Sequence, residues 1–255
     1  MQQNEIKKFV KLISGMSPPN ENSINIYQGN SYEAKLRRKN LLAYLTKMLE
    51  LEPKTILIGE APGIHGCGKT GIPFTDEFAI ATEQFFENGD FGNMGLDHER
   101  SAAVIWNVIR NKKEMPFMWN IYPFQPLSTT KSKRSNMPTN RTPTGEEIEI
   151  GRDIFMELLY IYKFENFYAI GKKAFDALVE VIPETKYIRH PSHGGMKECS
   201  EALNELLWHF IKFITMRKTI LLLLSLLIST SFIAKAQDTL YLNKQDDVKK
   251  VFEIL

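Results

Sequence analysis

The sequence predicts a three-layer α/β/α domain built around a central, mainly parallel sheet of four strands. Three observations lead to this prediction. Short apolar segments alternate along residues 1–215 with longer segments that carry apolar residues at helical spacing. Several of the short segments stop abruptly at glycine or proline. The notable motifs each follow one of the short segments, as expected where parallel strands end at one edge of a sheet covered by helices.

The first part of this domain is expected to contain three helices and two strands. Leu36, Leu41, Leu45 and Met48 recur at helical spacing, and Pro53 marks the end of that helix. The predicted elements are helices over 33–51, 76–86 and 100–110 and strands over 55–58 and 117–121. In the third helix, Ala103, Ile105 and Ile109 are the expected inward positions.

The second part begins with a polar, basic stretch over 127–143, which we expect to be a surface loop. Thr144 is then predicted to cap a helix, because Glu147 stands at the capping-box position three residues later. The remaining predicted elements are helices over 144–162, 172–181 and 197–214 and strands over 166–170 and 186–189.

Bulk charge gives no support for binding to nucleic acid. The formal net charge is +2 at pH 7, and this surplus lies wholly in residues 216–255, since acids and bases are equal in number over 1–215. A local patch remains, because Lys131, Lys133, Arg134 and Arg141 follow one another without an intervening acid. This stretch is expected either to contact a DNA backbone or to be an ordinary solvated loop.

Cys67 and Cys199 are the only cysteines in the sequence. Two thiols are too few for a disulfide framework, a four-thiolate cluster or a cysteine-only zinc site. We therefore expect a reducing, cytoplasmic setting. The predicted protein is a monomer that uses no metal and no cofactor. Cys67 lies in a glycine-rich stretch and is interpreted as a small packing residue or, alternatively, as a reactive thiol.

Residues 216–255 resemble the opening of a second protein. Met216, Arg217 and Lys218 precede an apolar run over 219–234, and small residues follow at the spacing of a signal-peptidase site. Two joined reading frames would explain such a signal within a chain. The alternative is a membrane anchor, although the sixteen residues of 219–234 would span about 24 Å of a hydrocarbon core about 30 Å thick. The sequence thus predicts one domain over 1–215 and a separate segment over 216–255, with membrane attachment only if 219–234 form an anchor.

Three segments carry the residues of a candidate pocket. The first predicted strand stops at Gly59-Glu60-Ala61-Pro62-Gly63, and Phe74 follows within a loop. The second strand ends near Asn120, and the last leads into His190-Pro191-Ser192-His193-Gly194-Gly195. Because ligands bind beyond the carboxyl ends of parallel strands, these segments are expected to line one cleft.

Taken together, these motifs resemble the uracil-DNA glycosylase superfamily over roughly residues 40–215, with a letter-for-letter match over 59–63 to its Gly-Glu-Ala-Pro-Gly branch. The resemblance implies that Phe74 stacks on an extruded uracil while Gly59 and Ala61 form the wall beside it. Asn120 would bond the amide-like edge of the base, since its side chain carries one acceptor and two donors. The plainer interpretations are core packing for Phe74 and a turn for Asn120.

His190 matches the histidine of the superfamily's His-Pro-Ser motif. A neutral imidazole there would donate a hydrogen bond to the O2 atom of the base, where negative charge collects as the glycosidic bond breaks. Contacts to the DNA backbone are implied for Pro62, Gly63, Ser192, His193 and Gly194, and are expected for Lys131, Lys133 and Arg134. Gly194 lacks the bulk to fill the space that a flipped base leaves.

The water-activating group departs from the pattern. Many superfamily members carry Asp or Asn at the position of Ala61, and alanine offers no chemistry. Glu60 is therefore predicted to be catalytic, positioning water or stabilising the sugar cation, provided that it does not point into the core or pair with Lys69. Many members of the branch also bind an iron-sulfur cluster, which the two cysteines of this chain cannot support.

The predicted function is that of a DNA glycosylase acting on uracil or a related deaminated base in DNA, without metal or cofactor. Two alternatives stay open. Ala61 favours a catalytically silent module that binds DNA or uracil. Residues 63–70 formally match a phosphate-binding loop, which would make the protein a nucleotide hydrolase. That alternative requires a helix starting at Lys69, which Pro73 disfavours.

Overall fold

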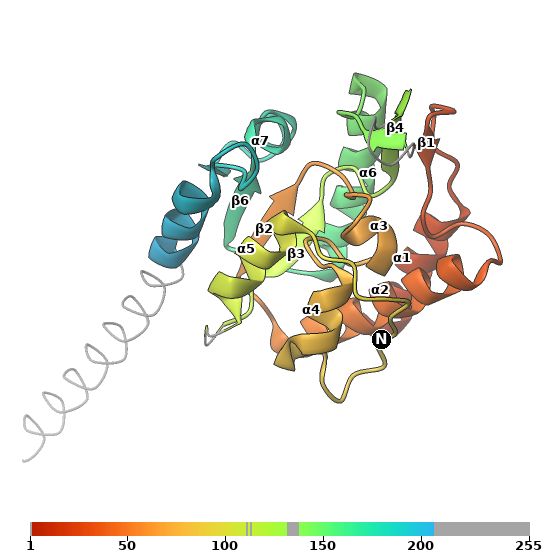
Figure 1. The fold of residues 1–255 in the computed structure, drawn as a ribbon, viewed down its shortest axis with the longest axis horizontal. Helices are drawn as coiled ribbons and strands as arrows, with labels where there is room; N and C mark the ends of the chain where they lie inside the picture. Colours follow the sequence, from red (N-terminus) through yellow and green to blue (C-terminus); the bar gives the residue numbers. More distant parts are fainter. Residues whose placement is uncertain (1, 111, 113, 132–137, 207–255) are drawn as a thin grey trace, which may run out of the picture. The chain divides into compact units, whose positions relative to one another are not determined.

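Four parallel strands form the central layer of the protein (Figure 1). The computed structural model describes residues 2–110, 112, 114–131 and 138–206. The strands are β2 (Thr55–Gly59), β3 (Phe117–Asn120), β6 (Asn166–Ile170) and β7 (Lys186–Ile188), and they lie in the order β3-β2-β6-β7. All three neighbouring pairs are parallel, and Gly59 at the end of β2 lies opposite Asn120 at the end of β3. The predicted fold class and the position of each of these strands are confirmed.

Helices cover both faces of the sheet. On one face, α6 (Gly145–Ile161) packs beside α7 (Lys172–Val179), and the Arg152 side chain donates a hydrogen bond to the Ala177 carbonyl at 2.7 Å. On the other face, α5 (Arg100–Ile109) runs into a loop whose Lys112 bonds Asn204 at 2.9 Å. Asn204 belongs to a helix over 196–206. This arrangement follows from right-handed crossovers, since the chain moves in opposite directions across the sheet after β2 and after β3.

Two N-terminal helices complete the covering layers. No prediction was made for α1 (Gln2–Gly15), whose buried residues Ile6, Phe9, Val10 and Ile13 follow helical spacing. The predicted helix over 33–51 is α2 (Tyr32–Leu51), which Ser31 caps through the Ala34 N–H. Inside the core, the Tyr44 hydroxyl accepts a hydrogen bond from the Met118 N–H at 2.6 Å, which ties α2 to β3.

The remaining predicted helices are present but shorter or divided. The helix expected over 76–86 consists of α4 (Glu77–Thr82) and a 3-10 turn, η1 (Gln84–Phe86), and the Asp76 carboxylate caps α4. In α5, Ile105 and Ile109 face inward as expected, whereas Ala102 is buried in place of Ala103. The helix expected over 197–214 is described from 196 to 206, and its later part lies outside the described residues.

The prediction of an irregular loop over 127–143 is wrong in part. Two strands, β4 (Gln125–Lys131) and β5 (Pro138–Asn140), pair antiparallel there, and β1 (Ser23–Ile24) joins the other edge of β4. Polar composition concealed these strands because they form a small sheet at the surface, where alternate burial of apolar side chains is not needed.

A buried carboxylate joins this small sheet to the main domain. Glu147, the capping-box residue of α6, is fully buried and accepts two hydrogen bonds from the Arg141 guanidinium, at 2.6 and 2.7 Å. The Ser23 hydroxyl donates a third at 2.7 Å, and the Thr144 N–H a fourth at 2.7 Å. Burial alone would raise the pKa of Glu147, but these hydrogen bonds outweigh it and lower the pKa to about 2.

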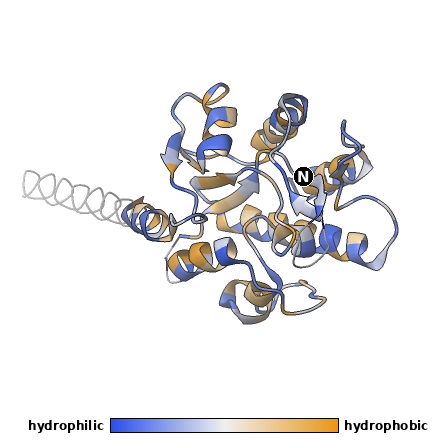
Figure 2. Ribbon diagram, turned by 45° about the horizontal axis from the view of Figure 1, so that its top comes forward, coloured by the Kyte–Doolittle hydropathy of each residue, from blue (hydrophilic) through white to orange (hydrophobic). Residues whose placement is uncertain are grey.

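Hydrophobic residues form stripes on the helices and fill the central strands (Figure 2), so the core lies between the sheet and its covering helices. No helix among the described residues is long and apolar enough to cross a membrane. The predicted signal-like segment over 216–255 lies outside the described residues.

Replacing Glu147 with glutamine should destabilise the fold by about 3 kcal/mol at neutral pH, because it leaves the Arg141 guanidinium without its buried counter-charge. The folded pKa of about 2 lies below the ordinary value of 4.5, so the stabilisation is complete above pH 4.5 and is lost as pH falls toward 2. Urea unfolding of both proteins at pH 7 and pH 3 measures the difference, which should shrink at the lower pH.

The matched control is Glu149→Gln in the same helix. Its carboxylate pairs with Arg152 at 2.6 Å but its side chain is 67% exposed, so the loss should stay below about 1 kcal/mol. Equal losses at Glu147 and Glu149 would contradict the role given to the buried carboxylate.

Candidate active site

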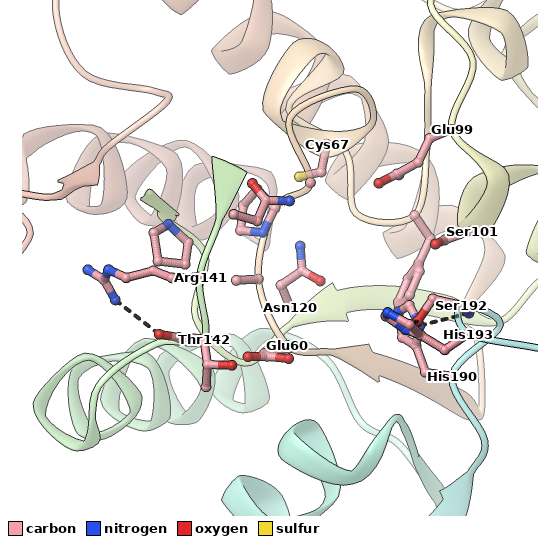
Figure 3. A pocket seen from close by; sticks show the side chains of 16 residues that line it. Glu60, Cys67, Glu99, Ser101, Asn120, Arg141, Thr142, His190, Ser192 and His193 are labelled. Atoms are coloured by element: carbon pink, nitrogen blue, oxygen red, sulfur yellow. Dashed lines mark hydrogen bonds between the residues drawn. The ribbon is translucent and has the colours of Figure 1, made fainter. Parts of the chain in front are cut away.

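A cavity of about 410 Å³ lies at the carboxyl ends of the parallel strands (Figure 3). Its lining includes nine of the residues that the sequence singled out: Glu60, Ala61, Pro62, Gly63, Phe74, Asn120, His190, Ser192 and His193. Asn120 is the last residue of β3, and the others come from segments that follow β2 and β7. The sheet therefore brings the three motifs to one place, as its strand order requires.

Gly59 allows the side chains of Phe74 and Asn120 to lie close to the end of β2. A methyl group at Gly59 would lie 2.6 Å from the Oδ1 atom of Asn120 and 2.6 Å from the Cζ atom of Phe74. Such contacts are far shorter than carbon and oxygen atoms tolerate. The aromatic ring and the amide can lie side by side only because the residue at the end of β2 has no side chain.

Phe74 is held in a backbone conformation that phenylalanine rarely adopts, with φ at +53°. The Trp106 indole N–H donates a hydrogen bond to its carbonyl at 3.1 Å, and the Thr70 hydroxyl donates one to the Thr75 carbonyl at 2.7 Å. Strain of this kind costs about 1–3 kcal/mol and is common where a binding site needs a side chain aimed in one direction.

Asn120 presents a nearly buried amide, with 4% of the residue exposed. Successive side chains of a strand alternate, so Asn120 lies on the face opposite Trp119, whose ring packs against Phe9 of α1. No hydrogen bond within the described residues uses the Asn120 side chain. Its acceptor and its two donors are therefore free for a ligand.

His190 is fixed as one neutral tautomer. The Ser192 backbone N–H donates to Nδ1 at 3.1 Å, and the Ser192 hydroxyl lies 2.7 Å from the same atom. Because a backbone N–H can only donate, Nδ1 acts as the acceptor and the proton resides on Nε2. Burial, together with the positive charges of Arg189 and His193, lowers the pKa of His190 below 6.5. At neutral pH the ring thus offers one N–H donor.

Glu60 also lines the cavity, with a half-buried carboxyl group. Its Oε1 atom is buried and has no hydrogen-bond partner within the described residues. Burial raises the pKa of Glu60, while a hydrogen bond with Thr142 and the charge of Lys173 act in the opposite direction. The two arrangements that would have removed it from the site, pairing with Lys69 or burial in the core, are both absent from the described residues.

Several of the residues predicted to contact a DNA backbone lie together at the cavity. Pro62, Gly63, Ser192 and His193 lie along the cavity, and Gly194 follows at φ +83°, a conformation suited to glycine. Lys131 is exposed at the end of β4 and is not part of the lining. The predicted contacts Lys133 and Arg134 lie outside the described residues.

The sequence did not identify several lining residues. They are Cys67, Glu99, Ser101, Pro126, Asn140, Arg141 and Thr142. Arg141 had been grouped with a basic patch, but its guanidinium is committed to Glu147 and serves the fold. Cys67 begins α3, Ser101 lies in the first turn of α5, and the rest lie in loops or on the small sheet. No strand-end signal precedes any of them. Burial raises the pKa of the Cys67 thiol far above its usual range, which favours the packing interpretation of this residue.

The phosphate-loop alternative lacks its structural context. The helix at this position, α3 (Cys67–Thr70), has a single turn and ends at Gly71, so Lys69 stands at its end and not at its start. A phosphate loop needs a longer helix whose first N–H groups point at the ligand.

The described residues contain no group of three or more His, Cys, Asp or Glu side chains that could hold a metal ion. Both cysteines are buried and free, and a cluster that needs four thiolates could not form from two.

Fold and cavity together define a three-layer α/β protein with a cavity at a topological switch point of its sheet. The family model described as "Uracil DNA glycosylase superfamily" matches residues 46–252, and the chain belongs to this superfamily, whose members are generally hydrolases of N-glycosidic bonds. Among solved structures, the chain is similar to SMUG2 from Pedobacter heparinus, with 16% identity and a TM-score of 0.62 over 83% of this chain and 98% of that one. At this identity the likeness shows the fold. No curated protein matches the sequence.

Replacing Gly59 with alanine should lower the free energy of unfolding by about 1–3 kcal/mol, because the added methyl group displaces Phe74 and Asn120. Urea unfolding measures the loss. Gly145→Ala is the control, since nothing lies within 4 Å of the methyl group there, and its stability should change by less than about 0.5 kcal/mol. A Gly59→Ala protein as stable as the control would contradict the packing described above.

Proposed function

We propose that this protein is a DNA glycosylase that hydrolyses the N-glycosidic bond of uracil, or of a related deaminated base, and leaves an abasic site. One observation carries the proposal: Phe74, Asn120 and His190 line a single cavity. An aromatic face, a free amide and an imidazole donor are the three contacts that recognition and departure of an extruded base require.

Base recognition is assigned to Phe74 and Asn120. The ring supplies a stacking surface for any planar base. The amide matches the N3–H donor and O4 acceptor of uracil, and it meets cytosine, whose donor and acceptor are exchanged, with the wrong polarity. Ala61 lines this side of the site. Gly59 is assigned to base binding as well, because its lack of a side chain leaves room for Phe74 and Asn120.

Departure of the base is assigned to His190. Its Nε2–H can donate to O2 of uracil, where negative charge develops as the bond breaks. The neutral ring keeps this donor, because its Nδ1 atom accepts the Ser192 N–H and its proton resides on Nε2. A placed donor of this kind is worth about 3–4 kcal/mol in other enzymes.

The sugar side of the reaction is assigned to Glu60. Its unpartnered carboxylate oxygen can hold a water molecule or face the positive charge that develops on the sugar. Ser192, His193, Gly194, Pro62 and Gly63 would meet the DNA backbone around the extruded nucleotide, with Lys131, Lys133 and Arg134 as further contacts. The proposed enzyme acts as a cytoplasmic monomer and needs no metal or cofactor.

Ala61 favours a second candidate function, that of a module that binds uracil or DNA without cleaving the N-glycosidic bond. The residue lines the cavity and offers no group that could activate water. An assay for abasic sites separates the two functions, since a binding module retains the oligonucleotide and leaves it intact.

We also propose that residues 1–215 form the glycosylase and that 216–255 derive from a joined reading frame. A mass spectrum of the native protein tests that division.

The full chain should release uracil from a uracil-containing oligonucleotide, with strand scission after alkali as the readout. His190→Ala should reduce the single-turnover rate by about 10²–10³-fold, because it removes the donor to O2. Asn120→Ala should reduce it too, and the double variant should show no scission above background. Wild-type protein with no more scission than the double variant would defeat the proposal.

A matched control is His98→Ala. His98 is an exposed histidine that lies 3.0 Å from Asp76, and it is not part of the cavity lining. Its replacement should leave the rate within about 3-fold of the wild type, so that a larger effect at His190 reports the cavity and not the loss of any histidine.

A further inference from the structure

Thr142 lines the cavity and has no assigned role in the proposed reaction. It is exposed, and its hydroxyl forms a hydrogen bond with the carboxyl group of Glu60. Figure 3 shows these two side chains beside each other, with Glu99 on another side of the cavity. The contact joins the end of β2 to the segment that follows β5, so two parts of the chain that are distant in sequence meet at this carboxyl group.

The backbone of Glu60 continues the pairing of β2 with the chain after β3. Its carbonyl accepts a hydrogen bond from the Tyr122 N–H at 3.1 Å, and the Gly59 carbonyl accepts one from the Ile121 N–H at 2.9 Å. The Glu60 side chain therefore leaves the sheet from a fixed point. Its Oε1 atom is buried and has no hydrogen-bond partner within the described residues. The Thr142 hydroxyl is thus a rare donor to a carboxyl group that burial has taken from water.

A buried ion pair fixes the other end of this contact. The Arg141 guanidinium, which donates to the Glu147 carboxylate at 2.6 and 2.7 Å, also donates to the Thr142 carbonyl at 3.1 Å. A further hydrogen bond runs from Arg141 to the Leu127 carbonyl at 3.2 Å. Pro143 follows, and the residue before a proline is restricted to extended backbone. The fold therefore determines where the Thr142 hydroxyl lies.

The role proposed for Glu60 needs a negative charge. A carboxyl group can accept a proton from water or face a sugar cation only while it is ionised. Burial opposes ionisation, because it raises the pKa of Glu60. The hydrogen bond from Thr142 acts in the opposite direction, and so does the positive charge of Lys173 near the start of α7.

We propose that Thr142 is a positioning residue for Glu60, whose hydroxyl donates to the carboxylate and fixes the direction in which it faces the extruded nucleotide. This inference rests on the proposed glycosylase function, in which Glu60 serves the sugar side of the reaction. Ala61 offers no group for that side. The acid at the preceding position takes its place, and a different segment of the chain orients it.

Several other groups around Glu60 can change charge. Within the described residues, the other titratable side chains of the cavity lining are those of Cys67, Glu99, Arg141, His190 and His193. Arg141 is paired with Glu147, and Lys173 is exposed on α7. A test of Thr142 must therefore identify the group that titrates as well as the change in rate.

The first measurement is the single-turnover release of uracil from a duplex oligonucleotide by the full chain as a function of pH. Ionised Glu60 is the active form, so the rate falls as pH falls through its folded pKa, which lies above 4.5. Thr142→Val removes the donor and keeps the shape of the side chain. It should move this acid limb of the profile upward by about 0.5–1 pH unit, the size of one hydrogen bond. The loss of rate should reach about 3–10-fold on the limb and shrink toward neutral pH.

The second measurement identifies the titrating group. The ¹³C chemical shift of the Glu60 carboxyl carbon, followed through an acid titration, should show the same displacement in Thr142→Val. Its signal is the one that is missing from Glu60→Gln. Thr142→Ser keeps the hydroxyl and should restore the wild-type limb.

The matched control is Thr139→Val on β5. The Thr139 hydroxyl donates to the Thr130 carbonyl at 3.1 Å, and the residue is not part of the cavity lining. Loss of a threonine hydroxyl here should leave both the acid limb and the Glu60 carbon signal in place.

The outcomes separate this inference from the proposed function. If the wild type releases uracil and Thr142→Val leaves the acid limb unmoved, the inference alone is overturned. A limb that moves without the Glu60 carbon signal assigns the effect to another group and also overturns it. An equal loss at every pH, shared by Thr142→Ser, shows a merely structural role and has the same consequence. Release of no uracil by the wild type overturns the glycosylase function and the inference with it.

Discussion

The absence of a side chain at Gly59 is the constraint on which the candidate site depends. Gly59 ends the strand β2, which lies between β3 and β6 in the sheet. The Phe74 ring and the Asn120 amide both fill the space where a Cβ atom of residue 59 would lie. An aromatic face and a free amide can therefore share one cavity, and parallel strands place that cavity at the edge where His190 also arrives.

Buried carboxylates stabilise the segments that surround the cavity. Glu147 binds Arg141, and the next residue, Thr142, forms a hydrogen bond with Glu60 in the cavity lining. Asp76 caps α4 and binds the backbone of Glu99. Both have their hydrogen-bonding capacity well used, as charges taken out of water must. Glu60 in the cavity lining differs, because its Oε1 atom is buried without a hydrogen-bond partner within the described residues, although Thr142 bonds the carboxyl group. Acids that stabilise the fold and the acid of the cavity are thus distinguished by their contacts.

His190 and Glu60 line the same cavity, and the imidazole of His190 is a neutral donor. In the proposed reaction, His190 would face the negative charge of the departing base and Glu60 the positive charge of the sugar. The basic patch expected from the sequence offers less free positive charge to a DNA backbone than its composition suggested, because Arg141 forms an ion pair with Glu147. Binding to a DNA backbone would then depend on main-chain groups around Ser192 and Gly63 more than on bulk charge.

The sequence by itself determined the four strands of the central sheet, most of the helices between them and the three motifs, because apolar periodicity, capping residues and glycine or proline breaks are local signals. It also determined that Phe74, Asn120 and His190 follow strands that end at one edge. Tertiary structure alone decided which neighbours share the cavity. The presence of Glu99 and Thr142 in the cavity lining depends on contacts between residues distant in sequence. The tautomer of His190 depends on the direction of the Ser192 backbone N–H. The β4–β5 pair escaped prediction for the same reason, since its strands are stabilised by pairing at the surface and by Glu147, and no apolar pattern marks them.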